Sequence, residues 1–383
     1  MAFSVRDGAC AEGGRRAGGE RFEEKYPAPA GGREVKRKNK KKADRKEETG
    51  KEAMPLLEVR QLKKYYPVSQ GWFSRTRYVK AVDGVDFDLD SGETLGLVGE
   101  SGCGKSTLAR VMLRLENPTE GSIFLGGEDL CALHGEALRR KRGLFQMIFQ
   151  DPYGSLNPRM SVFSALDEAL VLHTDLDSRA RSERIAELLE MVGLNPGYAR
   201  RHPHQFSGGQ RQRIGIARAL AVNPAFIVAD EPVSALDVSV QAQIVNLLQE
   251  IQKKTNVAFL FIAHDLAVVE HISSRIMVMY LGKIVETGPA SELCAHPAHP
   301  YTKALLSSVP RLHPEQGEGR IILKGDVPSP LDPPGGCRFH TRCPLSRPEC
   351  REHVPELRPL GGEERRHCSA CHFPEEVARL GRK

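Results

Sequence analysis

Short apolar runs and one alternating stretch predict a layered α/β protein. From residue 56 onward, strand-like and helix-like stretches follow each other along the chain, an order typical of helices packed on a sheet. Residues 85–89 alternate apolar and polar positions and predict a strand with one solvated face. Residues 94–98 are almost continuously apolar, which predicts a strand buried on both faces.

A glycine-rich loop follows residues 94–98 directly and leads into a helical pattern through Leu108, Met112 and Leu115. This strand–GxxxxGK[ST]–helix order is the pattern of a P-loop, whose backbone N–H groups and helix N-terminus bind phosphate. We expect Lys105 to bridge the outer phosphate oxygens and Ser106 to hold Mg²⁺. The predicted nucleotide-binding residues are Gly99, Glu100, Ser101, Gly102, Cys103, Gly104, Lys105, Ser106 and Thr107.

Two further apolar runs end in polar residues. Residues 226–229 lead into Asp230 and Glu231, and residues 257–263 lead into His264. A carboxylate at the end of a core strand is costly unless a cation faces it, so Asp230 is predicted to hold Mg²⁺ through water. Glu231 is predicted to polarise the attacking water, and His264 to contact the γ-phosphate. Two N-capping acids and a structural histidine are the alternatives.

Residues 206–213 (Phe-Ser-Gly-Gly-Gln-Arg-Gln-Arg) predict the start of a helix that runs to about Leu220, either a second phosphate site or a simple cap. The segment resembles the signature motif of ATP-binding-cassette (ABC) ATPases, with Phe206 where Leu is usual. The resemblance implies a P-loop NTPase cassette: a RecA-like core, an antiparallel β subdomain and a helical subdomain. It also implies a dimer in which Ser207, Gly208, Gly209 and Gln210 bind ATP held by the partner's P-loop.

Other positions fit the same resemblance. Gln150 corresponds to the Q-loop glutamine that senses Mg²⁺ and water, and Asp237 to the D-loop residue. Tyr66 is expected to stack on adenine, with Tyr65 as the alternative. The catalytic set is therefore Glu231, His264, Lys105 and Gln150. A helical subdomain is predicted before Gly193 from the spacing of Ile185, Leu188, Leu189 and Val192, and this apolar stripe is interpreted as core.

Residues 147–158 and 296–305 resemble the oligopeptide/dipeptide importer branch of this family. Importers of this branch usually have two unlike ATPase subunits, and residues 153–155 resemble the second of the two. We interpret the proline-containing segment 296–305 as a linker. The resemblance covers about residues 56–373 and includes a C-terminal group of cysteines. It implies a [4Fe–4S] cluster, with Zn²⁺ and free thiols as the alternatives. The predicted ligands are Cys337, Cys343, Cys350 and Cys371, the last preferred over Cys368.

Composition and charge narrow the classes of partner that the protein is expected to bind. The 383 residues carry a net charge of +6, of which residues 1–53 contribute +5 (fifteen Lys/Arg against ten Asp/Glu). We expect this tail to be disordered, and the nearly neutral remainder argues against nucleic-acid binding. No apolar run approaches the ~18–20 residues of a membrane span, and no signal peptide is recognised. The predicted domains are a tail (1–53), an ABC cassette (54–290) and a small Cys-rich extension (291–383).

Together these features predict an ATP- and Mg²⁺-dependent ATPase that powers import of di- and oligopeptides. Its expected partners are transmembrane permeases, a second ABC ATPase subunit and, indirectly, an extracytoplasmic solute-binding protein. Its expected place is the cytoplasmic side of the membrane, as a peripheral protein. The alternatives are an importer ATPase for another solute such as a metal chelate, a non-transport ABC ATPase, and an ATP-binding regulatory module. The 102 positions between Lys105 and Ser207 and the single cassette argue against chromosome-type and translation-type ABC proteins.

Overall fold

The computed structural model describes residues 54–69, 76–151, 153–309, 320–361 and 366–381. These residues belong to one compact unit. The basic tail, residues 1–53, lies outside the described residues, so its predicted disorder stays a prediction. Among the described helices, none has the length and apolar character needed to cross a bilayer.

A four-stranded antiparallel sheet follows the start of the described chain. Its strands lie in the order β2-β1-β4-β5. Their bounds are β1 Leu57–Val68, β2 Arg77–Leu89, β4 Glu120–Leu125 and β5 Glu128–Asp129. Within β2, Val85, Phe87 and Leu89 are buried and Asp86 is exposed. The predicted half-buried strand at residues 85–89 is therefore confirmed, although it begins earlier, at Arg77.

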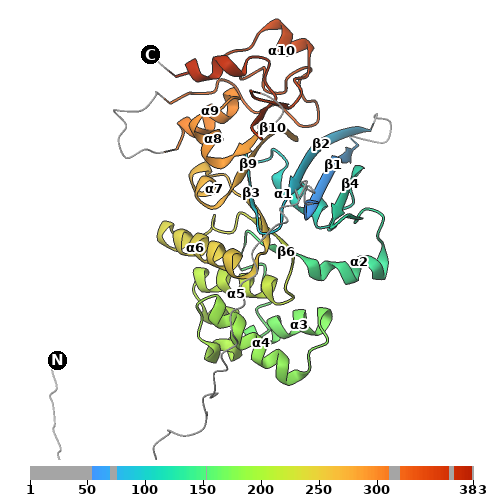
Figure 1. Ribbon diagram of the computed structural model, residues 1–383, viewed down its shortest axis with the longest axis vertical. Coiled ribbons are helices and arrows are strands. Elements are labelled where there is room, and N and C mark those ends of the chain that lie inside the picture. Colours follow the sequence, from blue (N-terminus) through green and yellow to red (C-terminus); the bar gives the residue numbers. More distant parts are fainter. Residues whose placement is uncertain (1–53, 70–75, 152, 310–319, 362–365, 382–383) are drawn as a thin grey trace, which may run out of the picture. The chain divides into compact units, whose positions relative to one another are not determined.

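The main sheet has eight strands in the order β11-β12-β10-β9-β3-β8-β7-β6 (Figure 1). The five strands from β9 to β6 pair in parallel, and β10, β12 and β11 continue the sheet in antiparallel pairs. The bounds are β3 Thr94–Val98, β6 Phe145–Ile148, β7 Phe226–Asp230, β8 Ala258–Ile262, β9 Arg275–Tyr280, β10 Lys283–Pro289, β11 Arg358–Pro359 and β12 Cys368–Ser369.

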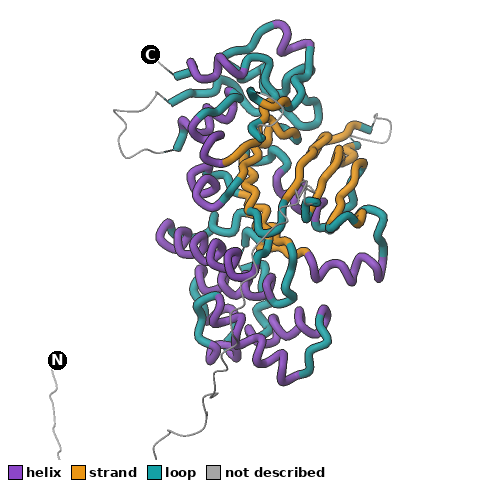
Figure 2. The backbone as a smooth tube through the Cα atoms, viewed as in Figure 1, coloured by secondary structure: helices purple, strands orange, loops and turns teal. Residues whose placement is uncertain are grey.

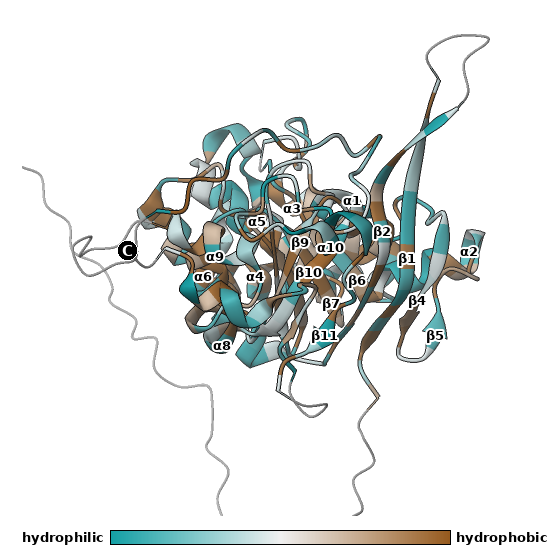
Figure 3. Cartoon of the chain, turned by 90° about the horizontal axis from the view of Figure 1, so that it is seen from above, coloured by the Kyte–Doolittle hydropathy of each residue, from teal (hydrophilic) through white to brown (hydrophobic). Residues whose placement is uncertain are grey.

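Burial on both faces explains the continuous apolar runs of the central strands. Along β7, Ile227 and Ala229 belong to one hydrophobic cluster, while Phe226 and Val228 belong to the other. In Figure 3 the hydrophobic colour gathers accordingly around β6, β7 and β9. Because neither face meets water, polar residues have no place between the apolar ones. The strands expected at 94–98, 226–229 and 257–263 are confirmed to within one residue at each end.

Helix α1 (Lys105–Met112) packs between the two sheets (Figure 2). Its Leu108 and Met112 share a hydrophobic cluster with residues of β1 and β3. The predicted helical pattern extended to Leu115, but the helix ends at Met112. Arg114 has φ 50°, a left-handed conformation that an α-helix does not continue, and Leu115 is half exposed.

The other helices include those of the predicted helical subdomain. Its helices α3 and α4 contact each other and α5. Leu188 and Leu189 of α4 are buried in the core cluster, as predicted. The bounds of the helices to α7 are α2 Gly135–Lys141, α3 Val162–His173, α4 Ser178–Met191, α5 Gly208–Leu220, α6 Val238–Thr255 and α7 Leu266–Ile272. The 3-10 segments are η1 Arg142–Leu144, η2 Pro196–Arg200, η3 Pro203–Gln205 and η5 Pro374–Arg379.

The segment interpreted as a linker is instead a buried helix. Helix α8 (Ala290–Ala295) is followed by α9 (Pro300–Ser307), and α10 spans Pro348–Glu352. Pro300 occupies the first position of α9, where its missing N–H costs nothing, and the His299 side chain accepts a hydrogen bond from Tyr301 N–H at 3.2 Å. Tyr301 is fully buried and packs on Tyr280, with 4.8 Å between ring centroids. The prolines therefore mark a helix start, and the linker interpretation was wrong.

Candidate functional site

The glycine-rich loop joins β3 to α1 and is shaped by its glycines. Gly104 has φ 112°, and a Cβ there would lie 2.1 Å from the Ala81 carbonyl oxygen. Only glycine fits so close to another backbone. Gly102 has φ 79°, and a Cβ there would meet no atom within 4 Å, so this part of the loop faces open space. The loop thus combines a tight backbone with an accessible inner side.

The Lys105 side chain lies inside this loop and is only 5% exposed. Its ammonium donates hydrogen bonds to the carbonyl oxygens of Gly99 at 2.8 Å and Glu100 at 3.1 Å. These two carbonyl oxygens replace water as hydrogen-bond partners of the buried positive charge. The ammonium is therefore held at the start of α1, beside the N–H groups that bind phosphate in a P-loop.

The next residue of the loop meets the end of β7. Ser106 Oγ donates a hydrogen bond to Asp230 Oδ1 at 3.2 Å. Asp230 is 5% exposed, and burial raises the pKa of its carboxyl, with Glu231 adding to the rise and Ser106 opposing it. A buried carboxylate beside a hydroxyl is an oxygen donor set of the kind that Mg²⁺ prefers. The residues present therefore fit the predicted Mg²⁺.

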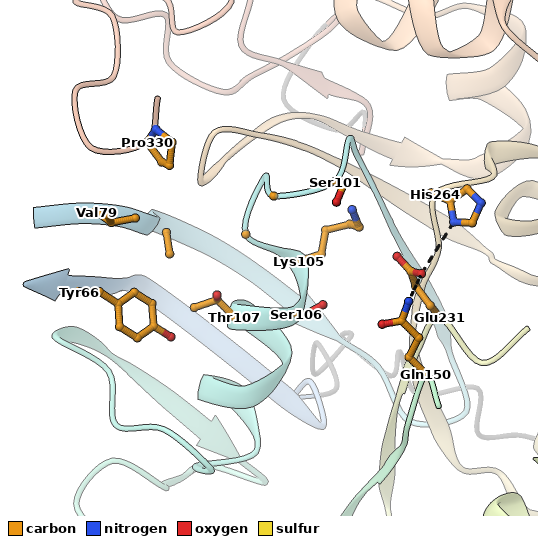
Figure 4. A pocket seen from close by; sticks show the side chains of 13 residues that line it. Tyr66, Val79, Ser101, Lys105, Ser106, Thr107, Gln150, Glu231, His264 and Pro330 are labelled. Atoms are coloured by element: carbon orange, nitrogen blue, oxygen red, sulfur yellow. Dashed lines mark hydrogen bonds and ion pairs between the residues drawn. The ribbon is translucent and has the colours of Figure 1, made fainter. Parts of the chain in front are cut away.

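Three side chains from separate segments converge beside this pair (Figure 4). Gln150 Nε2 donates to Glu231 Oε2 at 2.8 Å, and His264 Nδ1 lies 3.9 Å from the same oxygen. The Glu231 side chain is 19% exposed, and the His264 side chain is 66% exposed. Glu231 has φ 46°, a left-handed conformation that is unusual for a glutamate and that concentrates at functional sites. All three were predicted to act together, and the structure places them together.

Lys105, Ser106, Gln150, Glu231 and His264 line one pocket of about 530 Å³, whereas Asp230 is not part of its lining. In Figure 4, Tyr66 lies at one end and Glu231 at the other, with Lys105 and Ser106 between them. The Tyr66 hydroxyl donates to Glu116, and the Lys64 ammonium lies 5.0 Å from the centre of the Tyr66 ring. The full lining is Tyr66, Val79, Ala81, Ser101, Gly102, Gly104, Lys105, Ser106, Thr107, Gln150, Glu231, His264 and Pro330.

The choice of Tyr66 over Tyr65 agrees with this pocket. Tyr65 is not among the described residues that line it, because its hydroxyl donates to Asp83. The sequence analysis missed Val79, Ala81 and Pro330. Val79 is the cross-strand partner of Tyr66, so pairing of these two strands would have indicated that Val79 lies near the Tyr66 end of the pocket. Pro330 lies in an irregular segment, where no motif or hydrophobic pattern marks it as a pocket residue.

The residues of the predicted signature motif form a well-capped helix start elsewhere. Helix α5 begins after Ser207, whose Oγ accepts from Gln210 N–H at 3.4 Å, while Gln210 Oε1 accepts from Ser207 N–H at 3.0 Å. The helix ends at Leu220, as predicted. Among the residues that line the pocket, none comes from 207–210, and Asp237 is absent as well. Within one chain these groups do not join the P-loop site.

The C-terminal cysteines are partly or fully buried. Cys337 N–H donates to the Cys350 carbonyl oxygen at 2.8 Å. Burial raises the pKa of Cys343 to about 11 and of Cys371 to about 12, and neighbouring cysteines of the predicted set add to both shifts. Burial also raises the pKa of Cys368, and Arg275, rather than another cysteine, opposes the rise. However, the described residues contain no group of three or more His, Cys, Asp or Glu side chains arranged to hold a metal ion. The predicted cluster is therefore not supported by this geometry.

Comparison with known families gives two separate matches. Residues 82–234 match the ABC transporter family, and residues 285–350 match the C-terminal region of oligopeptide/dipeptide transporters. The oligopeptide transport ATP-binding protein AppF of Bacillus subtilis is 55% identical over 83% of this chain and 97% of its own length. The dipeptide transport ATP-binding protein DppF of Escherichia coli is 49% identical over 81% and 92%.

Solved structures give the same fold. The dimeric post-hydrolysis structure of the ATP-binding cassette MJ0796 bound to ADP and Pi is 27% identical, with a TM-score of 0.55 over 61% of this chain and 98% of that one. CbiO1 from Clostridium perfringens, part of the ABC transporter complex cbiONQ, is 26% identical, with a TM-score of 0.55 over 63% and 91%. Both similarities leave out more than a third of the present chain.

Proposed function

The chain belongs to the ATP-binding proteins of the ABC transporter family, and from this premise we propose that it powers the import of di- and oligopeptides. As a member of that family it is an ATPase that uses ATP and Mg²⁺. The observation that carries the site assignment is the pocket that the P-loop shares with Gln150, Glu231 and His264, with Asp230 hydrogen-bonded to the pocket residue Ser106. Peptide as the transported class is supported by the match of residues 285–350 and by the relatives named above.

The P-loop, in the middle of the pocket, supplies positive charge and hydrogen-bond donors. Lys105 would turn from the carbonyl oxygens it now contacts to the outer phosphate oxygens of ATP. Ser106 and Asp230 would hold Mg²⁺, with Gln150 next to them at the end of β6. Phosphoryl transfer needs little covalent chemistry from the protein, so this positioning and charge neutralisation provide most of the acceleration.

Water attack is assigned to the Glu231 end of the pocket. Glu231 polarises the water, Gln150 orients Glu231 through the 2.8 Å hydrogen bond, and His264 stabilises the charge on the γ-phosphate. At the opposite end Tyr66 stacks on adenine, next to Val79 and Thr107. Each role uses only residues of this chain.

A second cassette would complete the site. Ser207, Gly208, Gly209 and Gln210 form a phosphate-ready helix start that lies outside the pocket of its own chain. A partner cassette placed face to face would bring its signature helix to this P-loop, with Asp237 at the interface. The MJ0796 cassette was solved as a dimer, which supports this arrangement. ATP binding then closes the dimer and hydrolysis reopens it.

The surface next to Gln150 is suited to a membrane partner. A second pocket, of about 440 Å³, adjoins the site and includes Leu115, Phe149, Gln150 and Arg218. Phe149 is 42% exposed and Tyr153 is 64% exposed, which is high for aromatic residues. Because Gln150 contacts Glu231, a permease that docks here would be coupled directly to hydrolysis. The protein would then work peripherally on the cytoplasmic face, with a solute-binding protein acting through the permeases.

The C-terminal thiols remain a separate hypothesis. We propose that Cys337, Cys343, Cys350 and Cys371 bind either a [4Fe–4S] cluster or Zn²⁺, with structural rather than catalytic purpose. The hydrogen bond between the backbones of Cys337 and Cys350 supports closeness of two members, while the present side-chain arrangement does not hold a metal. Iron and zinc counted per chain after anaerobic purification decide the matter, and a preparation with neither metal would reject it.

Glu231→Gln tests the assignment of the hydrolytic site. The variant should bind ATP normally but lose kcat by about 10²–10⁴-fold, because the general base is removed while the phosphate site is intact. Glu183→Gln on the exposed side of α4 is the control and should behave as the unchanged protein. Full hydrolysis by Glu231→Gln would reject the assigned role.

The transported class needs a separate measurement. In vesicles containing the permeases and the solute-binding protein, ATP-dependent uptake of labelled dipeptides and pentapeptides is expected. A nickel chelate serves as the competing solute. Uptake of the chelate without uptake of either peptide would replace peptide import with chelate import.

A further inference from the structure

The C-terminal extension contacts the P-loop directly at Glu100. Glu100 is the second residue of the loop, and its N–H donates to the Tyr301 hydroxyl oxygen at 2.7 Å. Its carboxylate accepts from Arg342 at 2.8 Å. Its carbonyl oxygen accepts from Lys105 at 3.1 Å. The same carbonyl oxygen also accepts from Cys103 N–H at 3.2 Å, so two of the four partners of Glu100 belong to the extension.

Both partners from the extension are firmly placed. Tyr301 is fully buried in α9, where it packs on Tyr280 and on Phe339, with ring centroids 4.8 Å and 5.4 Å away. The Arg342 side chain is 9% exposed, against 26% for Glu100. A packed ring and a mostly buried guanidinium cannot follow a moving loop at low cost. The extension therefore acts as the fixed side of this contact.

The same extension also contacts β2 at two points, and one of the contacting residues, Pro330, lines the nucleotide pocket. Arg338 donates to the Leu281 carbonyl oxygen and to Asp83, on the strand that also carries Val79. The Pro330 carbonyl oxygen accepts from Lys80 N–H at 3.1 Å, and Pro330 itself lines the pocket. In Figure 4 it lies next to Val79, across from Tyr66. The extension thus forms part of the wall of the pocket as well as holding the loop.

We propose that Tyr301 and Arg342 are positioning residues for ATP binding, which hold Glu100 so that the P-loop is already shaped for the triphosphate. A preformed loop binds more tightly because the ordering cost is met before the ligand arrives. The contribution is to binding in the ground state and the transition state alike, so it changes KM and leaves kcat nearly unchanged. This inference rests on the proposed assignment of the nucleotide site.

The alternative is that these contacts only stabilise the fold. That role would lower the melting temperature of a variant but leave the affinity of the remaining folded protein for MgATP unchanged. The dissociation constant of MgATP, measured on folded protein by displacement of a fluorescent ATP analogue, separates the two. The KM and kcat of ATP hydrolysis provide the second readout.

Three substitutions test the contact from both sides. Tyr301→Phe removes only the hydroxyl. Arg342→Gln removes the positive charge of the guanidinium, and Glu100→Gln removes the negative charge of the loop carboxylate. Each should raise the dissociation constant and KM about three- to tenfold, the value of one buried or charge-assisted hydrogen bond. Arg342→Lys keeps the charge and should recover part of the affinity. The double variant Glu100→Gln/Arg342→Gln should bind MgATP no more weakly than either single variant, because each substitution removes the same interaction.

Matched controls come from the same extension. Thr302→Val, next to Tyr301 on α9, removes a buried hydroxyl that has no hydrogen-bond partner among the described residues. Arg347→Gln breaks an ion pair with Glu376 at 2.6 Å, which lies outside the residues lining the nucleotide pocket. Both should leave the MgATP affinity unchanged. Loss of affinity in either control equal to that of Tyr301→Phe would overturn the proposal, since the effect would then be general.

Lys105→Ala distinguishes failure of the inference from failure of the assigned site. If Lys105→Ala binds MgATP as well as the unchanged protein, the site assignment itself is wrong. If Lys105→Ala loses binding while Tyr301→Phe, Arg342→Gln and Glu100→Gln keep full affinity, only the role of the extension is rejected. If the three variants have higher dissociation constants for MgATP and the two control variants bind it normally, the proposed role of the extension is supported.

Discussion

Removal of Glu286 should destabilise the protein strongly although the residue lies outside the pocket. Glu286 is on β10 and is fully buried. One carboxylate oxygen accepts from Ala298 N–H at 2.7 Å and from His367 Nε2 at 2.8 Å, and the other accepts from His299 N–H at 2.9 Å. The side chain therefore satisfies three buried donors that lie 12, 13 and 81 residues away along the chain.

The size of the effect follows from those three donors. Glu286→Ala leaves two backbone N–H groups and one imidazole unpaired inside the protein, and each such group costs about 1–3 kcal/mol. Since neighbours relax in part, we expect a loss of about 3–5 kcal/mol in the free energy of unfolding, the range for breaking a buried charged contact. Glu286→Gln keeps one oxygen but turns an NH₂ group toward a donor, so about 1–3 kcal/mol is expected.

Urea unfolding followed by circular dichroism measures both variants. Glu292→Gln is the control, because this residue is 40% exposed and its carboxylate lies 3.7 Å from His367 Nδ1. A partly exposed carboxylate at this distance from its partner contributes about 0–1 kcal/mol. If Glu286→Ala unfolds within 1 kcal/mol of the unchanged protein, the carboxylate does not hold α9 and β12 on the sheet, and the reasoning is refuted.

Three shorter predictions concern the nucleotide site and the signature helix. Gly104→Ala should cost about 1–3 kcal/mol and abolish measurable ATP binding, because its Cβ would lie 2.1 Å from the Ala81 oxygen; Gly126→Ala, with φ 56° and an open surrounding, is the control that should keep ATP binding. Burial raises the pKa of Asp230, so the nucleotide-free protein gains stability as pH falls from neutral toward the normal range of an aspartate. Asp230→Asn should therefore melt at a higher temperature than the unchanged protein without nucleotide, with a weaker pH dependence, and lose Mg²⁺-dependent hydrolysis; a lower melting temperature would contradict the assigned cause. Ser207→Ala removes the cap of α5 and should cost about 1 kcal/mol and weaken ATP-dependent dimerisation in size-exclusion chromatography, whereas capping alone would leave the dimer intact.

Local sequence patterns predicted the parts of the site whose residues are close together in the chain. The P-loop, the start of α5 at Ser207 and the central strands all lie where the patterns indicated. Each depends on interactions between near neighbours: glycines that permit a turn, a serine that caps a helix, apolar residues that bury a strand. Such interactions are nearly independent of the rest of the fold, so spacing alone reveals them.

The patterns were less informative where a residue's role depends on a distant partner. The prolines near residue 300 were interpreted as signs of a linker, yet Pro300 begins a helix whose Tyr301 is buried against Tyr280. Proline is compatible with both a linker and a first helical position. The decision depends on whether a hydrophobic surface is available to cover the helix, and that surface is formed by β9 and by Phe339.

By itself, the sequence predicted a phosphate-binding loop, a metal-binding carboxylate and a capped signature helix, because those motifs consist of contiguous residues. Only the tertiary structure decided that Gln150 and His264 meet at Glu231, that Tyr66 rather than Tyr65 faces the pocket, and that Tyr301 and Arg342 hold the P-loop. Glu100 and Arg342 are 242 residues apart. Contacts across such distances are set by the order of strands in the sheet and by the packing of helices on it, and no local spacing in the chain encodes them.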